Sequence, residues 1–207
     1  MNININENRF FLLNFNVQFD DDYQTIIDEL KKEEWVPQGL KQYVGQENEA
    51  FYSRWLIKDG NIKSLPLKKI INYIQSEKVH ESVLDHLYSF EPQFEGLWGM
   101  PKEKMYRFAH WHAYYQLDKP GFELKLHTDY RRLIATGMIY LTEKDDPNVA
   151  TYFYWDKKPE NEIRTTTNYG DGWLHVNDGP NFHTGANRSQ EDRYTILLGL
   201  TIKHPDD

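Results

Sequence analysis

The stretch PGFELKLHTDYRRLIATGMIYL, residues 120–141, carries the strongest structural and chemical signals in the chain. It opens on a Pro-Gly turn and ends in the apolar run Ile134 to Leu141, which predicts a buried strand. Between them stand His127 and Asp129. In a strand, residues i and i+2 point to the same face, so this pair can bind one metal ion from one strand.

A third metal ligand has to come from elsewhere, and His183 is the best candidate. It lies in the turn-rich stretch NFHTG, residues 181–185, just before the last apolar segment. Two imidazoles and one carboxylate on one face of an octahedron suit Fe(II), because they leave adjacent coordination positions open. An isolated His-x-Asp is often only a surface ion pair, so the prediction depends on its surroundings. His175, in an apolar segment, is expected to be a hydrogen-bonded interior residue instead.

Arg193 follows His183 by ten positions and opens the last apolar segment. Its planar guanidinium can pair with a carboxylate through two parallel hydrogen bonds, which suits a cation that binds an acidic cosubstrate. Thr195 shares the strand face of Arg193 and can add a hydroxyl donor. A surface position is the alternative, because Glu191 and Asp192 come directly before Arg193.

The rest of the chain divides into two regions. Residues 1–104 contain an alternating apolar segment over 13–19, and helical spacing i, i+3, i+4, i+7 from Tyr23 and again from Leu67. Residues 105–203 contain several short apolar segments separated by turns, a pattern typical of a sandwich or barrel. We therefore predict a single domain over all 207 residues, mainly β with flanking α-helices.

The composition restricts the kind of site. There is no cysteine, so any transition-metal site has to use the 8 His and carboxylates. The chain has 24 Lys and Arg against 32 Asp and Glu, a net charge of -8, which argues against a general nucleic-acid partner.

The start has no signal-peptide pattern, and no apolar run approaches the roughly 20 residues of a membrane span. A soluble, cytoplasmic protein with no membrane partner is expected.

Together these segments resemble the Fe(II)- and 2-oxoglutarate-dependent oxygenases, within them the prolyl-hydroxylase-like branch. The resemblance covers roughly residues 105–203. It rests on the order and spacing of Pro120-Gly121, Leu124, His127-x-Asp129, the run ATGMIYL at 135–141, Gly170-Asp171, His183-Thr184-Gly185 and Arg193. The resemblance implies a double-stranded β-helix (jelly roll) core over 105–203, with residues 1–104 supporting one sheet.

The resemblance also implies roles for individual residues. His127, Asp129 and His183 would bind Fe(II). Arg193, assisted by Thr195, would bind the distal carboxylate of 2-oxoglutarate. The implied enzyme is a dioxygenase that uses Fe(II), 2-oxoglutarate and dioxygen, with hydroxylation of a peptide side chain or a small molecule as the expected reaction.

A tyrosine on the strand before the triad is expected to contact the cosubstrate in this family. Tyr114 and Tyr115 are the candidates, and neighbouring strand residues face opposite ways, so only one is expected to do so, with Tyr114 preferred. Tyr140 is a further candidate. Residues 148–151, NVAT, stand where that branch commonly has a Gly-Gly pair and an acidic residue, and Arg193 stands where it often has Lys. Both differences weaken the case for proline as substrate.

Two other kinds of protein stay open. A cupin-type metal-binding protein is suggested by His110 and His112, and by Asn187 four residues after His183. Against it, the first Glu after His112 is distant, at Glu123. The second is a metal-free jelly-roll binding module, against which the spacing of the metal ligands and the arginine argues.

Overall fold

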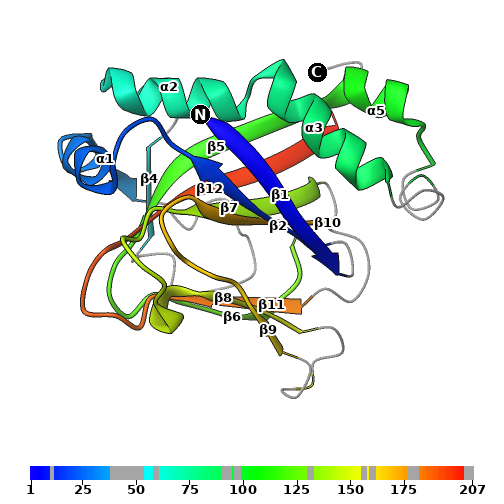
Figure 1. Ribbon diagram of the computed structural model, residues 1–207. Helices are drawn as coiled ribbons and strands as arrows, with labels where there is room; N and C mark the ends of the chain where they lie inside the picture. The colour runs from blue at the N-terminus through cyan, green and yellow to red at the C-terminus, as the bar shows by residue number, and fades with distance from the viewer. Residues whose placement is uncertain are drawn as a thin grey trace.

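The computed structural model describes residues 1–9, 12–37, 54–57, 61–89, 95, 99–129, 133–154, 158, 162–176 and 182–202. Two antiparallel sheets lie face to face, and helices cover the outer face of the larger one (Figure 1). The prediction of a mainly β protein with flanking helices is confirmed. Within these ranges, every helix is too short or too polar to span a membrane.

The larger sheet has eight strands in the order β1-β2-β10-β7-β12-β5-β4-β3. Neighbouring strands in this order are antiparallel. The sheet combines strands from both regions of the sequence. They are β1 (Asn2–Arg9), β2 (Leu12–Gln18), β3 (Val36–Pro37), β4 (Arg54–Ile57), β5 (Ala109–Asp118), β7 (Leu133–Tyr140), β10 (Asp171–Val176) and β12 (Arg193–Ile202).

The smaller sheet has four strands in the order β6-β11-β8-β9, and it lies below the larger sheet in Figure 1. They are β6 (Glu123–His127), β8 (Thr151–Tyr154), β9 (Glu162–Arg164) and β11 (Phe182–Ala186), and a short 3-10 helix, η4 (Pro147–Val149), precedes β8. Two such facing antiparallel sheets form the expected jelly-roll barrel. The space between them is the interior in which a site can form.

The helices pack on the larger sheet through one apolar face each. They are α1 (Tyr23–Leu30), α2 (Leu65–Ile74), α3 (Glu77–Tyr88) and α5 (Lys102–Phe108). In α2 the buried residues are Leu67, Ile70, Ile71 and Ile74, the spacing that the sequence predicts. The carboxylate of Asp22 caps α1 by accepting a hydrogen bond from the backbone N–H of Thr25 at 2.8 Å. In Figure 1, α2 and α3 run across the upper face of the sheet, opposite the smaller sheet.

Strand β12 contributes side chains to both faces of the larger sheet. Ile196, Leu198 and Leu200 belong to the core that the larger sheet forms with the helices. Arg193, Thr195 and Leu197 alternate with them and therefore point toward the smaller sheet. The alternation of residues along β12 therefore directs apolar side chains toward the helices and a mixture of polar and apolar side chains toward the smaller sheet.

The structure corrects three details of the sequence prediction. Residues 105–108 lie in the region expected to form strands and turns but are helical, because α5 continues to Phe108 with the buried Met105 anchoring it. Strand β1 at one edge of the larger sheet, and β4 and β3 at the opposite edge, were not predicted, since they are polar or short. Asp129 lies beyond the end of β6 and not within the strand.

Candidate metal centre

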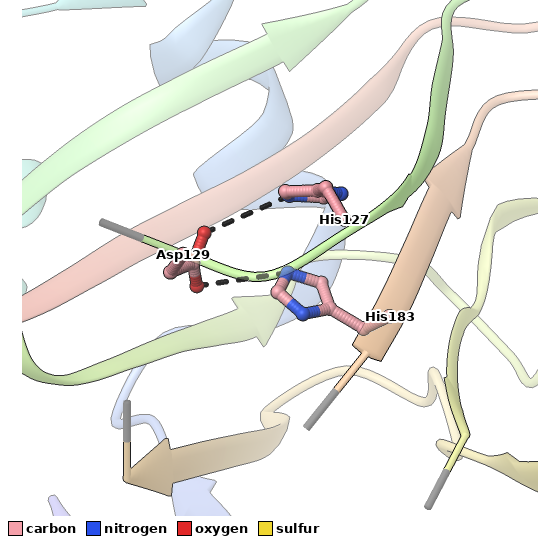
Figure 2. A group of neighbouring side chains, drawn as sticks. All are labelled: His127, Asp129 and His183. Carbon is pink, nitrogen blue, oxygen red and sulfur yellow. Dashed lines mark ion pairs between the residues drawn. The ribbon is translucent and has the colours of Figure 1, made fainter. Parts of the chain in front are cut away.

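The predicted ligands His127, Asp129 and His183 come together inside the barrel (Figure 2). His127 ends β6 and is the direct antiparallel partner of His183 on β11. Each of the three offers a ligand atom, and these atoms all lie within 4.8 Å of one another. The Nε2 atom of His127 is 3.6 Å from Oδ1 of Asp129, and Nε2 of His183 is 3.6 Å from Oδ2.

Hydrogen bonds orient these side chains for metal binding. Nδ1 of His127 lies 2.7 Å from the carbonyl oxygen of Lys125, which can only accept, so Nδ1 carries a proton and Nε2 is the ring nitrogen that faces Asp129. The hydroxyl of Thr136 donates to Oδ2 of Asp129. Partners of this kind fix the orientation of histidine and carboxylate ligands in metal sites.

The electrostatics of Asp129 also suit a metal ligand. Burial alone raises the pKa of its carboxyl, but the interaction with His127 and the neighbouring His183 outweigh burial and hold the pKa well below its ordinary value. The carboxylate is therefore ionised at neutral pH. Two imidazoles and one ionised carboxylate are a donor set that fits Fe(II), so the residues present match the metal that the resemblance implies.

His175 lies beside this group, although it was expected only to be an interior histidine. It is 1% exposed, and its ring is 5.0 Å from that of His183 between centroids. Burial lowers the pKa of the imidazole to about 3, with a smaller contribution from His183, so the ring is neutral. The expected interior position is correct, but the expected hydrogen bond is wrong, because neither ring nitrogen has a partner among the described residues.

Arg193 is buried on the barrel side of β12, with 2% of its surface exposed, so the alternative of a surface position is wrong. Its guanidinium pairs with the carboxylate of Asp118 through Nε, at 3.1 Å, and through Nη2. Its Nη1 donates to the carbonyl oxygens of Val149 and Ala186, at 2.8 and 3.1 Å. The predicted cosubstrate cation is thus already held by a carboxylate of the chain.

Sequence reasoning missed Asp118, because the run DKPG from residue 118 is a turn signal. Asp118 is in fact the last residue of β5 and the cross-strand partner of Arg193. Gln116 donates to Asp118 at 2.9 Å and to the hydroxyl of Thr195 at 3.3 Å. An alternating pattern in which polar residues follow Tyr114 along β5 is the signal that could have found this network.

Tyr140 is fully buried on the barrel side of β7, inside a cluster of hydroxyl groups. Its hydroxyl lies 2.8 Å from Oγ1 of Thr151 and 2.9 Å from Oγ1 of Thr165. The indole Nε1 of Trp173 donates to the same oxygen at 3.3 Å. Sequence reasoning singled out Tyr140 but none of these three partners, which lie 11, 25 and 33 residues away along the chain.

The two tyrosines of β5 separate as the alternation predicts. Tyr115 belongs to the core under the helices, and its hydroxyl donates to the carbonyl oxygen of Leu67 at 3.0 Å. Tyr114 faces the opposite way, and its cross-strand partner on β12 is Leu197, which packs in the barrel interior. Of the two, Tyr114 is therefore placed to contact a ligand in the barrel.

The residues that suggested a cupin have other roles. Nε2 of His112 is 2.8 Å from the hydroxyl of Thr201, and neither His110 nor His112 belongs to the group of converging ligand atoms. The side-chain amide of Asn187 donates to the carbonyl oxygens of Asp118 and Glu191, both at 2.8 Å. Asn187 thus joins two chain segments and faces no metal ligand.

Comparison with known proteins agrees with this geometry. The protein is similar to a prolyl hydroxylase from Trichoplax adhaerens, solved with a hypoxia inducible factor peptide fragment, at a TM-score of 0.60 and 14% identity over 93% of this chain and 84% of that chain. The fold is that of the Fe(II)- and 2-oxoglutarate-dependent oxygenases. The predicted jelly roll of this family is therefore confirmed.

Further solved oxygenases have this fold at similar levels of likeness to the chain. The α-ketoglutarate-dependent epimerase SnoN from nogalamycin biosynthesis has a TM-score of 0.57 at 13% identity, covering 94% of this chain and 77% of that chain. A prolyl-4-hydroxylase from Pseudomonas putida has a TM-score of 0.51 at 10% identity, covering 88% of this chain and all of that chain. No family model matches the sequence, and no curated protein matches it.

Proposed function

We propose that this protein is an oxygenase that uses Fe(II), 2-oxoglutarate and dioxygen to oxidise a small molecule or a peptide side chain, with hydroxylation as the expected outcome. The observation that carries the proposal is the convergence of His127, Asp129 and His183 inside a barrel with this family's fold. The triad holds Fe(II) through two imidazole nitrogens and one carboxylate. SnoN has been solved with Fe3+ and α-ketoglutarate, and HygX from Streptomyces hygroscopicus with nickel and 2-oxoglutarate.

The proposal assigns 2-oxoglutarate to the barrel interior behind the triad. Arg193 and Thr195 bind its distal carboxylate, and Tyr140 and Tyr114 line the same interior. Thr195 and Tyr140 are cross-strand partners on β12 and β7, and both are fully buried. Burial excludes water, which strengthens each hydrogen bond to an anionic ligand.

Asp118 offsets the positive charge of Arg193 in this part of the barrel interior. The pair Arg193–Asp118 is neutral as a unit, so a bound carboxylate meets less positive charge than an unpaired arginine would provide. Asp118 in return holds the guanidinium plane in one orientation. The hydroxyl of Thr195, which accepts from Gln116 and keeps its own proton to donate, then supplies a larger share of the hydrogen bonds to the cosubstrate.

When bound, iron and 2-oxoglutarate supply the oxidative decarboxylation and the oxidant, and the chain supplies orientation and a dry cavity. His127 and Asp129 are the more accessible ligands, with side chains 28% and 21% exposed, whereas that of His183 is 6% exposed. The substrate therefore approaches from the side of His127 and Asp129. The Trichoplax adhaerens enzyme is solved with a peptide and SnoN with nogalamycin RO, so both substrate classes fit this fold.

The test is conversion of 2-oxoglutarate to succinate by anaerobically prepared, Fe(II)-loaded protein after dioxygen is added. We expect turnover that a correct prime substrate stimulates, and none in Asp129→Ala. The matched control is Asp85→Ala, which removes a carboxylate from the exposed face of α3. Full turnover by Asp129→Ala, or none by the wild-type protein with a broad panel of peptides and small molecules, contradicts the proposal and favours a binding module.

A further inference from the structure

His175 is a buried histidine without a hydrogen-bond partner in the chain. It is 1% exposed, and neither Nδ1 nor Nε2 is hydrogen-bonded to any described residue. A neutral imidazole carries one donor and one acceptor, and leaving both unpaired inside a protein is unfavourable. Buried polar groups in this state point to a ligand as their partner.

The position of His175 indicates which ligand its ring nitrogens contact. His175 and Thr136 are cross-strand partners on β10 and β7, so they share the barrel face of the larger sheet. Thr136 contacts Asp129 through its hydroxyl, and the ring of His175 contacts that of His183. All three metal ligands come from β6, β11 and the residues after β6, so His175 faces the metal centre from the opposite sheet.

His175 lies on the closed side of the centre. His127 and Asp129 lie on the exposed side of the centre. His175 lies on the other side together with Trp173, whose indole N–H donates a hydrogen bond to the hydroxyl of Tyr140. This is the interior assigned above to the cosubstrate, and not the side from which a prime substrate enters. The imidazole therefore has as its hydrogen-bond partner the end of the cosubstrate that binds the metal.

The imidazole is held in one place by aromatic neighbours. Its ring centroid is 5.4 Å from that of Phe153 and 6.1 Å from that of Trp173. These surroundings are apolar, and an apolar ring of similar shape would satisfy them without unpaired nitrogens. Packing alone therefore does not account for a histidine at this position.

We propose that His175 is a positioning residue that hydrogen-bonds the metal-chelating end of the 2-oxo acid, at the carboxylate next to the keto group. This inference rests on the proposed function. The ring donates one N–H to a carboxylate oxygen, a charge-assisted hydrogen bond that fixes how the cosubstrate lies. His175 itself does not bind the metal, since it lies outside the group of converging ligand atoms.

The test is calorimetric titration of 2-oxoglutarate into Ni(II)-loaded protein, which is catalytically silent and reports binding alone. His175→Phe keeps a ring but removes both nitrogens. We expect its affinity for 2-oxoglutarate to fall about 10- to 100-fold, as for a lost hydrogen bond to a charged group, with Ni(II) affinity unchanged. His175→Asn or His175→Gln, which keep an N–H near Nδ1 or Nε2, should restore part of the loss.

A second measurement separates this role from a structural one. Metal-free His175→Phe should unfold at a higher temperature than the wild-type protein, because it loses unpaired buried nitrogens. The matched control is His80→Phe in α3, where a partly buried histidine with an unpaired Nε2 packs on Tyr106, outside the barrel. This control should bind 2-oxoglutarate like the wild-type protein.

Three outcomes overturn the inference. Wild-type affinity for 2-oxoglutarate in His175→Phe shows that the imidazole does not touch the cosubstrate. A loss of Ni(II) affinity in the same variant assigns His175 to support of the metal ligands. Absence of 2-oxoglutarate binding in the Ni(II)-loaded wild-type protein contradicts the proposed function itself and the inference with it.

Discussion

At the scale of single residues, the proposed metal centre depends on neighbours that hold its ligands in place. His127 is oriented by the carbonyl of Lys125, and Asp129 by the hydroxyl of Thr136. The sequence pattern predicted the three proposed ligands from their types and spacing. It could not identify Thr136, because a threonine in an apolar strand looks like any β-branched strand residue until the fold places it beside Asp129.

Thr136→Val is the direct test of this support. Valine keeps the shape of threonine but removes the hydroxyl that donates to Asp129, so the carboxylate loses its fixed orientation. We expect metal affinity to fall about 10- to 100-fold, the range usual for lost partners of metal ligands. Equilibrium dialysis with Mn(II) measures it. Thr201→Val, which removes the partner of His112, is the control, and equal affinities in both variants would count against this role of Thr136.

The buried pair Arg193–Asp118 gives a stability prediction. Arg193→Met leaves the carboxylate of Asp118 buried without its cation, so we expect the free energy of unfolding to fall by about 3–5 kcal/mol. Adding Asp118→Asn removes that charge and should recover more than half of the loss. Urea unfolding of the single and double variants measures both steps, and a double variant no more stable than Arg193→Met would show that the ion pair is not the cause.

The same double variant tests the role of Arg193 toward the cosubstrate. This variant is expected to regain stability while still lacking the guanidinium, so a change in its affinity for 2-oxoglutarate reports on binding and not on folding. We expect metal-loaded Arg193→Met/Asp118→Asn to bind 2-oxoglutarate much more weakly than the wild-type protein does. Unchanged affinity would mean that Arg193 is purely structural and that the hydroxyl groups alone hold the distal carboxylate.

At the scale of helices and strands, the sequence pattern was most informative where one face is apolar. The spacing from Leu67 and the alternation in β12 predicted elements that the structure contains. The pattern failed at β3 and β4, which have two and four residues, because β4 takes its place by pairing with β5 and β3 by pairing with β4. Elements that tertiary pairing creates leave little local signal.

Two glycine turns allow a matched comparison. Gly170, before β10, and Gly121, before β6, both have positive φ, at 87° and 85°. An added Cβ at Gly170 would lie 2.2 Å from the carbonyl oxygen of Val17, whereas at Gly121 it would meet nothing within 4 Å. Gly121→Ala should therefore lose only the conformational term, about 1–2 kcal/mol.

Gly170→Ala should lose about 1–3 kcal/mol more, because the backbone of β2 has to move as well. Thermal and urea unfolding of the two variants measure the difference. Equal losses of stability would show that the backbone of Val17 can move away from an added Cβ at Gly170 at little energetic cost. A greater loss at Gly121 would contradict the assigned turn geometry.

At the scale of the whole molecule, the larger sheet divides the protein into two layers. One face packs on helices through an apolar core, and the other closes a barrel with the smaller sheet (Figure 1). The resemblance to the oxygenase family predicted this arrangement. It did not predict the partners of Arg193 and Tyr140 inside the barrel, because Asp118 and Thr165 reach them only when segments distant in sequence are brought together.

The central claim is that His127, Asp129 and His183 form a metal centre on which 2-oxoglutarate depends. Anaerobic titration of 2-oxoglutarate into protein with and without Fe(II) tests it most directly. We predict one Fe(II) per chain, cosubstrate binding only when the metal is present, and loss of both in Asp129→Ala. Binding of Fe(II) and 2-oxoglutarate by Asp129→Ala at wild-type affinity would contradict the account.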